Sequence, residues 1–140
     1  MMSSRREQIL TKMVELLSAA NIGAPVERSR TSAISRAQSP RVIVLASSDI
    51  ASQPFVPYLH WALSAHVVVY VRGAQPDVLA DPIIAAAHAA LMADQTLGGL
   101  VMNIMPASTH FELSDADEAA CVATCTFTIT YRTTQQDLTQ

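Results

Sequence analysis

The sequence predicts an α+β fold: one mostly antiparallel or mixed sheet with two main helices packed on it, in the order α-β-β-β-α-β-β. Two segments carry apolar residues at helical spacing, and the segments around them have the apolar runs or the alternation of strands. The 140 residues suit a single domain, 1–140. Half of them are hydrophobic and only 15% are charged, which excludes a disordered chain.

The first helix is expected over residues 4–20, where apolar residues recur every three or four positions. Ser4 and Glu7 have the spacing of a capping box at its start. Asn21 and Gly23 supply a stop, because both residue types tolerate the left-handed backbone that ends helices.

A short extended piece and two longer strands, separated by loops, are expected next. A short extended piece at 26–30 precedes a polar loop at 31–40. Residues 41–46 are apolar on both faces, which is typical of an internal strand. Residues 47–57 contain two prolines and are expected to form another loop, with no assigned role. Residues 58–72 alternate as a long strand with one apolar and one mixed face.

The second helix is expected over residues 81–97. Asp81 and Pro82 fit its N-cap and first helical position, and a shorter helical turn from Gln75 is the alternative start. The pair Gly98-Gly99 supplies the stop.

Two further strands, at 100–113 and 121–133, are joined by the acidic turn 114–118. The last strand alternates a core face with a face rich in threonine. Cys121 and Cys125 lie on its core face about 13 Å apart, so we expect two inert thiols and no disulfide.

No catalytic, cofactor or metal site is expected, and the protein is not predicted to be an enzyme. The sequence has no nucleophile elbow, Walker loop or dinucleotide motif. The acidic turn has ligands suited to a hard cation, but a solvated turn is the favoured interpretation. Ordinary surface or half-buried side chains are favoured over metal ligands for the four histidines, His60, His66, His88 and His110.

The charges are unevenly distributed along the chain. Residues 1–41 hold seven of the nine basic residues and three of the twelve acidic ones, a balance of +4, and the remainder carries −7. The arginine-bearing segment lacks aromatic residues that would stack on bases, which disfavours a nucleic-acid partner. The uncharged run at 50–71 contains prolines and histidines, so no membrane partner is expected. A solubilising loop and an interface loop are equally favoured by composition.

Several segments carry a resemblance to a known family. The sharpest are the Leu-Gly-Gly-Leu turn that ends 93–100 and the Phe-x-Ile-x-Tyr-Arg-Thr pattern within 126–133. The others are 5–10, 26–30 and 41–45. With these segments the sequence resembles the tail terminator, or tail-completion, proteins of long-tailed bacteriophages, the family of the lambda minor tail protein U and its prophage relatives.

The resemblance implies a structural virion protein. Such subunits assemble as a ring, expected to be a hexamer, on the head-proximal end of the tail tube, where they stop its elongation and present a surface for head joining. The implied partners are other copies of the chain, the tail tube protein and a head-completion or connector protein. The implied location is the tail or neck of the virion, and the host cytoplasm during assembly.

A heterologous ring needs two different surfaces, and the uneven charge provides a pair of them. The candidate interface residues are Arg28, Arg30, Arg36 and Arg41, with Arg132, Phe55 and Tyr58 as weaker candidates, opposite Asp115, Asp117 and Glu118. The alternatives are a head–tail connector of the same neck region, a small cytoplasmic enzyme and a nucleic-acid-binding module.

Overall fold

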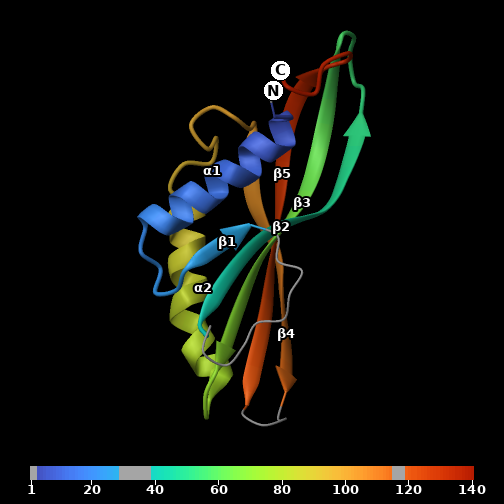
Figure 1. Ribbon diagram of the computed structural model, residues 1–140. Coiled ribbons are helices and arrows are strands. Elements are labelled where there is room, and N and C mark those ends of the chain that lie inside the picture. The colour runs from blue at the N-terminus through green and yellow to red at the C-terminus, as the bar shows by residue number, and fades with distance from the viewer. Residues whose placement is uncertain (1–2, 29–38, 115–118) are drawn as a thin grey trace.

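The computed structural model describes residues 3–28, 39–114 and 119–140 (Figure 1). The predicted α+β class and element order are confirmed. In chain order the elements are α1 (Arg5–Ala19), β1 (Val26–Arg28), β2 (Arg41–Ser52), β3 (Tyr58–Arg72), α2 (Pro76–Met92), β4 (Asn103–Ser114) and β5 (Ala120–Thr134).

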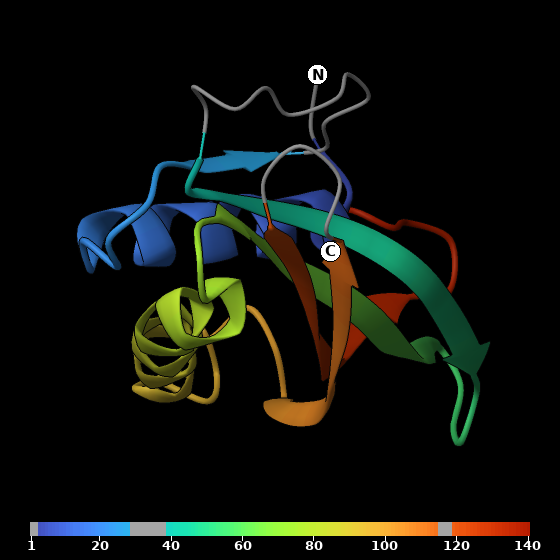
Figure 2. The same ribbon diagram turned by 90° about the horizontal axis from the view of Figure 1, so that it is seen from below.

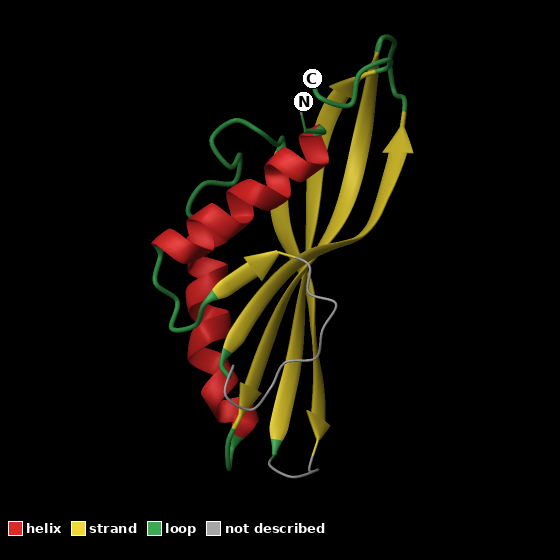
Figure 3. Ribbon diagram, viewed as in Figure 1, coloured by secondary structure: helices red, strands yellow, loops and turns green. Residues whose placement is uncertain are grey.

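The described strands form one five-stranded mixed sheet in the order β1-β2-β3-β5-β4. Only the short β1 pairs in parallel, with β2, and the other neighbours are antiparallel. Both helices lie on the same side of the sheet (Figures 2 and 3). β4 is an edge strand, because its single neighbour among the described strands is β5.

The core lies between the sheet and the two helices. The predicted inward faces of β3 and β5 are buried, and the threonine face of β5 is largely half-exposed. Burying a leucine or isoleucine side chain of this kind stabilises the fold by about 1.5–3 kcal/mol. The largest fully buried side chains are Ile9, Leu10, Met13, Leu17, Leu63, Leu91, Leu97, Ile104, Ile129, Val42, Val44 and Val67.

The predicted ends of α1 are confirmed to within a residue. The Ser4 hydroxyl accepts a hydrogen bond from the Glu7 backbone N–H at 3.2 Å, which satisfies one of the free donors at the helix start. After the helix, Asn21 and Gly23 adopt positive φ angles of 53° and 95°. Of the described helices, neither is long and apolar enough to cross a membrane.

The start of the second helix predicted at Asp81-Pro82 and its predicted end were wrong, whereas the earlier helical turn from Gln75 is confirmed. α2 begins at Pro76 and contains Pro82 in its interior. Pro76 takes the first-turn position where the missing N–H costs nothing, and Pro82 removes only one bond from the early part of the helix. The helix ends at Met92, because Leu97 lies in a turn with φ +48° where Asp94 accepts hydrogen bonds from the backbone of Thr96 and Gly98.

The predicted loop at 47–57 was also wrong in its first half. β2 continues to Ser52 and pairs with β3 from Ser48 onwards, after a bulge between Ala46 and Ser48. The residues beyond the bulge are polar or exposed, so they lack the alternation that signals a strand, and the backbone of β3 fixes their conformation instead. We call the segment that connects β2 to β3, residues 53–57, the hairpin tip.

Candidate functional site

Two of the predicted interface arginines are bound within the subunit. Arg28 Nη2 lies 2.8 Å from Glu7 Oε2, and its Nη1 donates to the carbonyl oxygen of Val44 at 2.8 Å. Arg41 Nε lies 3.7 Å from Glu27 Oε1. Arg28 therefore ties α1 to β2, so a substitution there alters folding as well as any interface.

Five predicted interface residues lie outside the described ranges. They are Arg30, Arg36, Asp115, Asp117 and Glu118.

The three weaker candidates are brought together at one end of the sheet. The Arg132 guanidinium lies over the Tyr58 ring, 4.4 Å from its centroid, in a cation–π contact. The Phe55 ring makes edge contacts with Tyr58 and with His60, at centroid distances of 6.1 and 5.4 Å. These contacts fix the aromatic side chains next to the hairpin tip.

The hairpin tip exposes large apolar side chains. Val56 is 74% exposed and Phe55 is 49% exposed. Ile50, three residues before the tip, is 67% exposed. Exposed apolar groups gathered in this way are typical of a surface that binds another protein. Phe55 was a predicted interface residue, but Val56 and Ile50 were not, because 47–57 was expected to be a loop with no assigned role.

A second exposed apolar surface lies on the edge strand β4. Phe111 and Leu113 are 49% and 66% exposed. They pair with Ala123 and Cys121, near the start of β5, whereas Tyr58 beside the hairpin tip pairs with Thr134 at the end of β5. The two apolar surfaces therefore lie towards opposite ends of the sheet (Figure 1).

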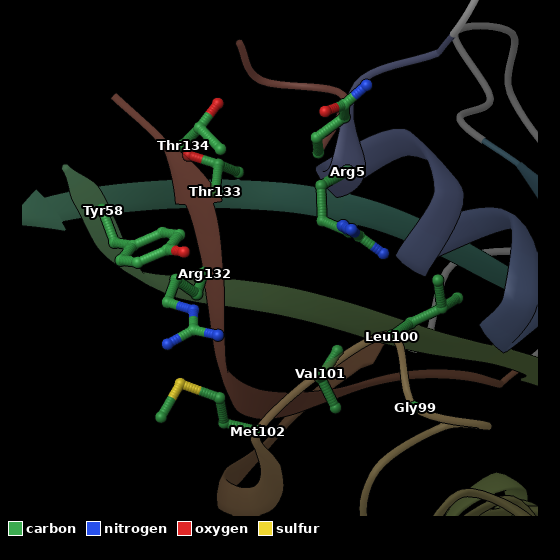
Figure 4. Close-up of a pocket in the computed structure, with 10 residues that line it drawn as sticks. Arg5, Tyr58, Gly99, Leu100, Val101, Met102, Arg132, Thr133 and Thr134 are labelled. Atoms are coloured by element: carbon green, nitrogen blue, oxygen red, sulfur yellow. The ribbon is translucent and has the colours of Figure 1, made fainter. Parts of the chain in front are cut away.

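An open groove of about 450 Å³ lies close to the hairpin tip. Figure 4 shows Arg5 of α1 on one side of it, Arg132 and Tyr58 on the other, and the segment 99–102 along its lower edge. Thr133, Thr134 and Gln140 complete its lining. Arg5 was not a predicted site residue, since its place at the start of a helix gave no sign of a groove formed by distant segments.

A buried carboxylate links the extended part of β2 to α1 and β5. Arg6 Nη1 lies 3.1 Å from Asp49 Oδ2, and the Tyr131 hydroxyl donates to the same oxygen. The Asp49 side chain is only 6% exposed. Burial, and then the hydrogen bond to Asp49 and its charge, raise the pKa of Tyr131 well above its usual value. The contacts hold the three elements together.

Both cysteines are buried and free, as predicted. Burial raises the pKa of each thiol, and the charge of Asp77 adds to the rise at Cys121. A raised pKa leaves less of the reactive thiolate at a given pH.

We therefore expect both thiols of the native protein to react with a thiol reagent at pH 7.5 more than about tenfold slower than in urea. The measurement is absorbance after mixing with Ellman's reagent. A fast native reaction of either thiol would contradict the inert interpretation, and the Cys125→Ala variant assigns the two signals.

In the described residues no group of three or more His, Cys, Asp or Glu side chains is arranged to hold a metal ion. His110 lies 3.7 Å from Glu112 on the exposed face of β4. The chain matches no protein-family model and none of the curated proteins with which it was compared.

Proposed function

We propose that this protein is a structural subunit of a phage tail. Copies of it close into a ring of six at the head-proximal end of the tail tube. The ring stops elongation of the tube and presents the surface on which a head-completion or connector protein docks. The position on the tail rests on the resemblance of the sequence to tail terminator proteins, and the ring rests on the geometry of the subunit.

The observation that carries the proposal is the pair of unlike exposed apolar surfaces. The hairpin tip with Ile50 forms one, and Phe111 with Leu113 forms the other, towards the opposite end of the sheet. A two-fold dimer buries one surface against its own copy, whereas a ring needs two different surfaces that match each other. In the proposed ring, the hairpin tip of each copy packs against the β4 edge of the next.

A ring contact of this kind also protects the edge strand. The outer edge of β4 has backbone N–H and C=O groups without a strand partner among the described residues, and most of its residues are exposed. Exposed edges of this length are prone to unwanted pairing unless something covers them. A neighbouring copy in a closed ring supplies such a cover for every subunit.

The proposed function is tested on growing tail tubes. The purified protein is added to polymerising tail tube protein encoded alongside it, and tube lengths are measured by negative-stain electron microscopy. We expect shorter tubes with a ring of extra density at one end. Unchanged tube lengths with bare ends would contradict the terminator function, and binding to the head-side partner alone would favour the connector alternative.

A further inference from the structure

The groove beside the hairpin tip contains two guanidinium groups and no Asp or Glu side chain. Arg5 and Arg132 come from α1 and β5, and the described residues form no ion pair with either. The Nε of Arg5 is buried and has no hydrogen-bond partner in the part of the chain that the structure describes. The Arg132 guanidinium lies over the face of the Tyr58 ring, 4.4 Å from its centroid.

These two arginines differ from three other arginines of the first helix and the sheet, which pair with acidic side chains. Arg6 pairs with Asp49, Arg28 with Glu7 and Arg41 with Glu27. A buried donor without a partner destabilises the protein, and more so when it is charged. Since the guanidinium fork fits a carboxylate with two parallel hydrogen bonds, the groove has the chemistry to bind carboxylates.

The groove also has apolar walls. Leu100 and Met102 line it, and Met102 is half-exposed. A ligand that fits both features carries carboxylates separated by small apolar groups. The chain has one such segment, Asp115-Ala116-Asp117-Glu118, which lies outside the described residues.

We infer that this groove binds the acidic segment 115–118 of the neighbouring copy, an inference that rests on the proposed ring. Within one subunit the groove lies far from Leu113 and Ala120, which flank the segment in the chain. β5 runs without interruption from Ala120 to Thr134, and Thr134 lines the groove. Fifteen strand residues span ~45 Å, whereas the two-residue step from Ala120 back to Glu118 covers at most about 7 Å.

The separation fits a contact between copies that run head to tail. The groove lies next to the hairpin tip, and the acidic segment follows Leu113 after one residue. The charged contact therefore lies beside the apolar contact of the proposed ring. In the ring, the arginines select the correct end of the neighbour and the apolar side chains supply most of the buried area.

The experiment exchanges the charges. A groove variant carries Arg5→Glu and Arg132→Glu, and a segment variant carries Asp115→Arg and Asp117→Arg. Each variant alone places like charges together and is expected to stay monomeric by size-exclusion chromatography with light scattering. An equimolar mixture is expected to restore rings, because groove and segment are complementary at every contact of a six-membered ring that alternates the two variants.

The matched controls are Lys12→Glu and Glu15→Arg on α1, which reverse charges outside the groove, the segment and the proposed apolar contacts. Both are expected to form rings as the unmodified protein does. If the unmodified protein forms rings and the groove variant does too, the inference is overturned while the ring proposal stands. If the unmodified protein forms no ring even on tail tubes, both fail together.

A second measurement does not depend on ring formation or on the folding of the double variants. A synthetic peptide of residues 113–120 is titrated into the ¹⁵N-labelled protein, and the Nε–H resonances of Arg5 and Arg132 are followed by NMR. We expect both to shift, and the Arg132→Gln variant to lose binding by about tenfold or more. Equal shifts with the neutral peptide Leu-Ser-Asn-Ala-Asn-Gln-Ala-Ala, or shifts with inorganic phosphate alone, would overturn the inference.

Discussion

The Val56→Asp variant is expected to fold normally and to form no rings. Val56 is the most exposed large apolar side chain of the hairpin tip, so its replacement changes the free energy of unfolding by no more than about 0.5 kcal/mol. In the proposed ring this position is covered by the next copy, and a carboxylate buried there without a partner costs about 3 kcal/mol or more per contact. That cost weakens each contact by about 100-fold or more.

The measurement is light scattering across a range of protein concentrations, with thermal unfolding followed by circular dichroism. Ala19→Asp is the control, because Ala19 is exposed at the end of α1, and Figure 1 shows this end of the helix away from the hairpin tip and from β4. We expect Ala19→Asp to assemble as the unmodified protein does. Rings of Val56→Asp at the usual concentration would remove the hairpin tip from the interface.

The Tyr131→Phe variant is expected to be less stable by about 1.5–3 kcal/mol at pH 7. The substitution removes the hydroxyl that donates to the buried carboxylate of Asp49, and hydrogen bonds to charged groups contribute about this much. Asp49 then keeps only the contact with Arg6 in the described part of the chain. The measurement is the free energy of unfolding from urea denaturation.

The difference between the two proteins is expected to shrink above pH 10. Folding raises the pKa of Tyr131, so its stabilising effect is complete below the unfolded value of about 10 and is lost as the pH rises above it. The loss amounts to about 1.4 kcal/mol for each pH unit between the unfolded and folded values. Tyr70→Phe is the control at pH 7, where we expect a change below about 0.5 kcal/mol. A constant difference from pH 7 to 11 would contradict the assigned role of Asp49.

The elements that bury one face were predictable from the sequence. β3 and β5 alternate because every second side chain packs against the helices. Ser4 and Glu7 mark the start of α1 in the sequence. The boundaries of α2 were harder to predict from the sequence, because both Pro76 and Pro82 are suitable first residues of a helix. Local preferences alone do not decide which proline lies inside a helix; packing does.

The extended part of β2 was not predictable, because no side-chain pattern marks it. Residues beyond the bulge are polar or exposed on both faces, and the strand forms there by pairing with β3. The sequence also contained no indication that Asp49 is a buried carboxylate, because its partners Arg6 and Tyr131 are distant in the chain. The same holds for the groove, whose arginines are separated by more than one hundred residues.

The predicted interface residues also fall into two groups, according to the partners that the fold gives them. The sequence named Arg132, Phe55 and Tyr58, which the structure brings together, and it named Arg28 and Arg41, which are bound to acids of their own subunit. Charge along a sequence indicates which residues are basic. It does not indicate which of them already have a partner, because the pairing depends on the fold.

The most direct test of the account is an electron-microscopic reconstruction of the assembled protein, free or on a tail tube. The account predicts a closed ring in which the hairpin tip of each copy contacts Phe111 and Leu113 of the next, with no two-fold axis between neighbours. A two-fold dimer in which the same surface of each copy meets itself would contradict it.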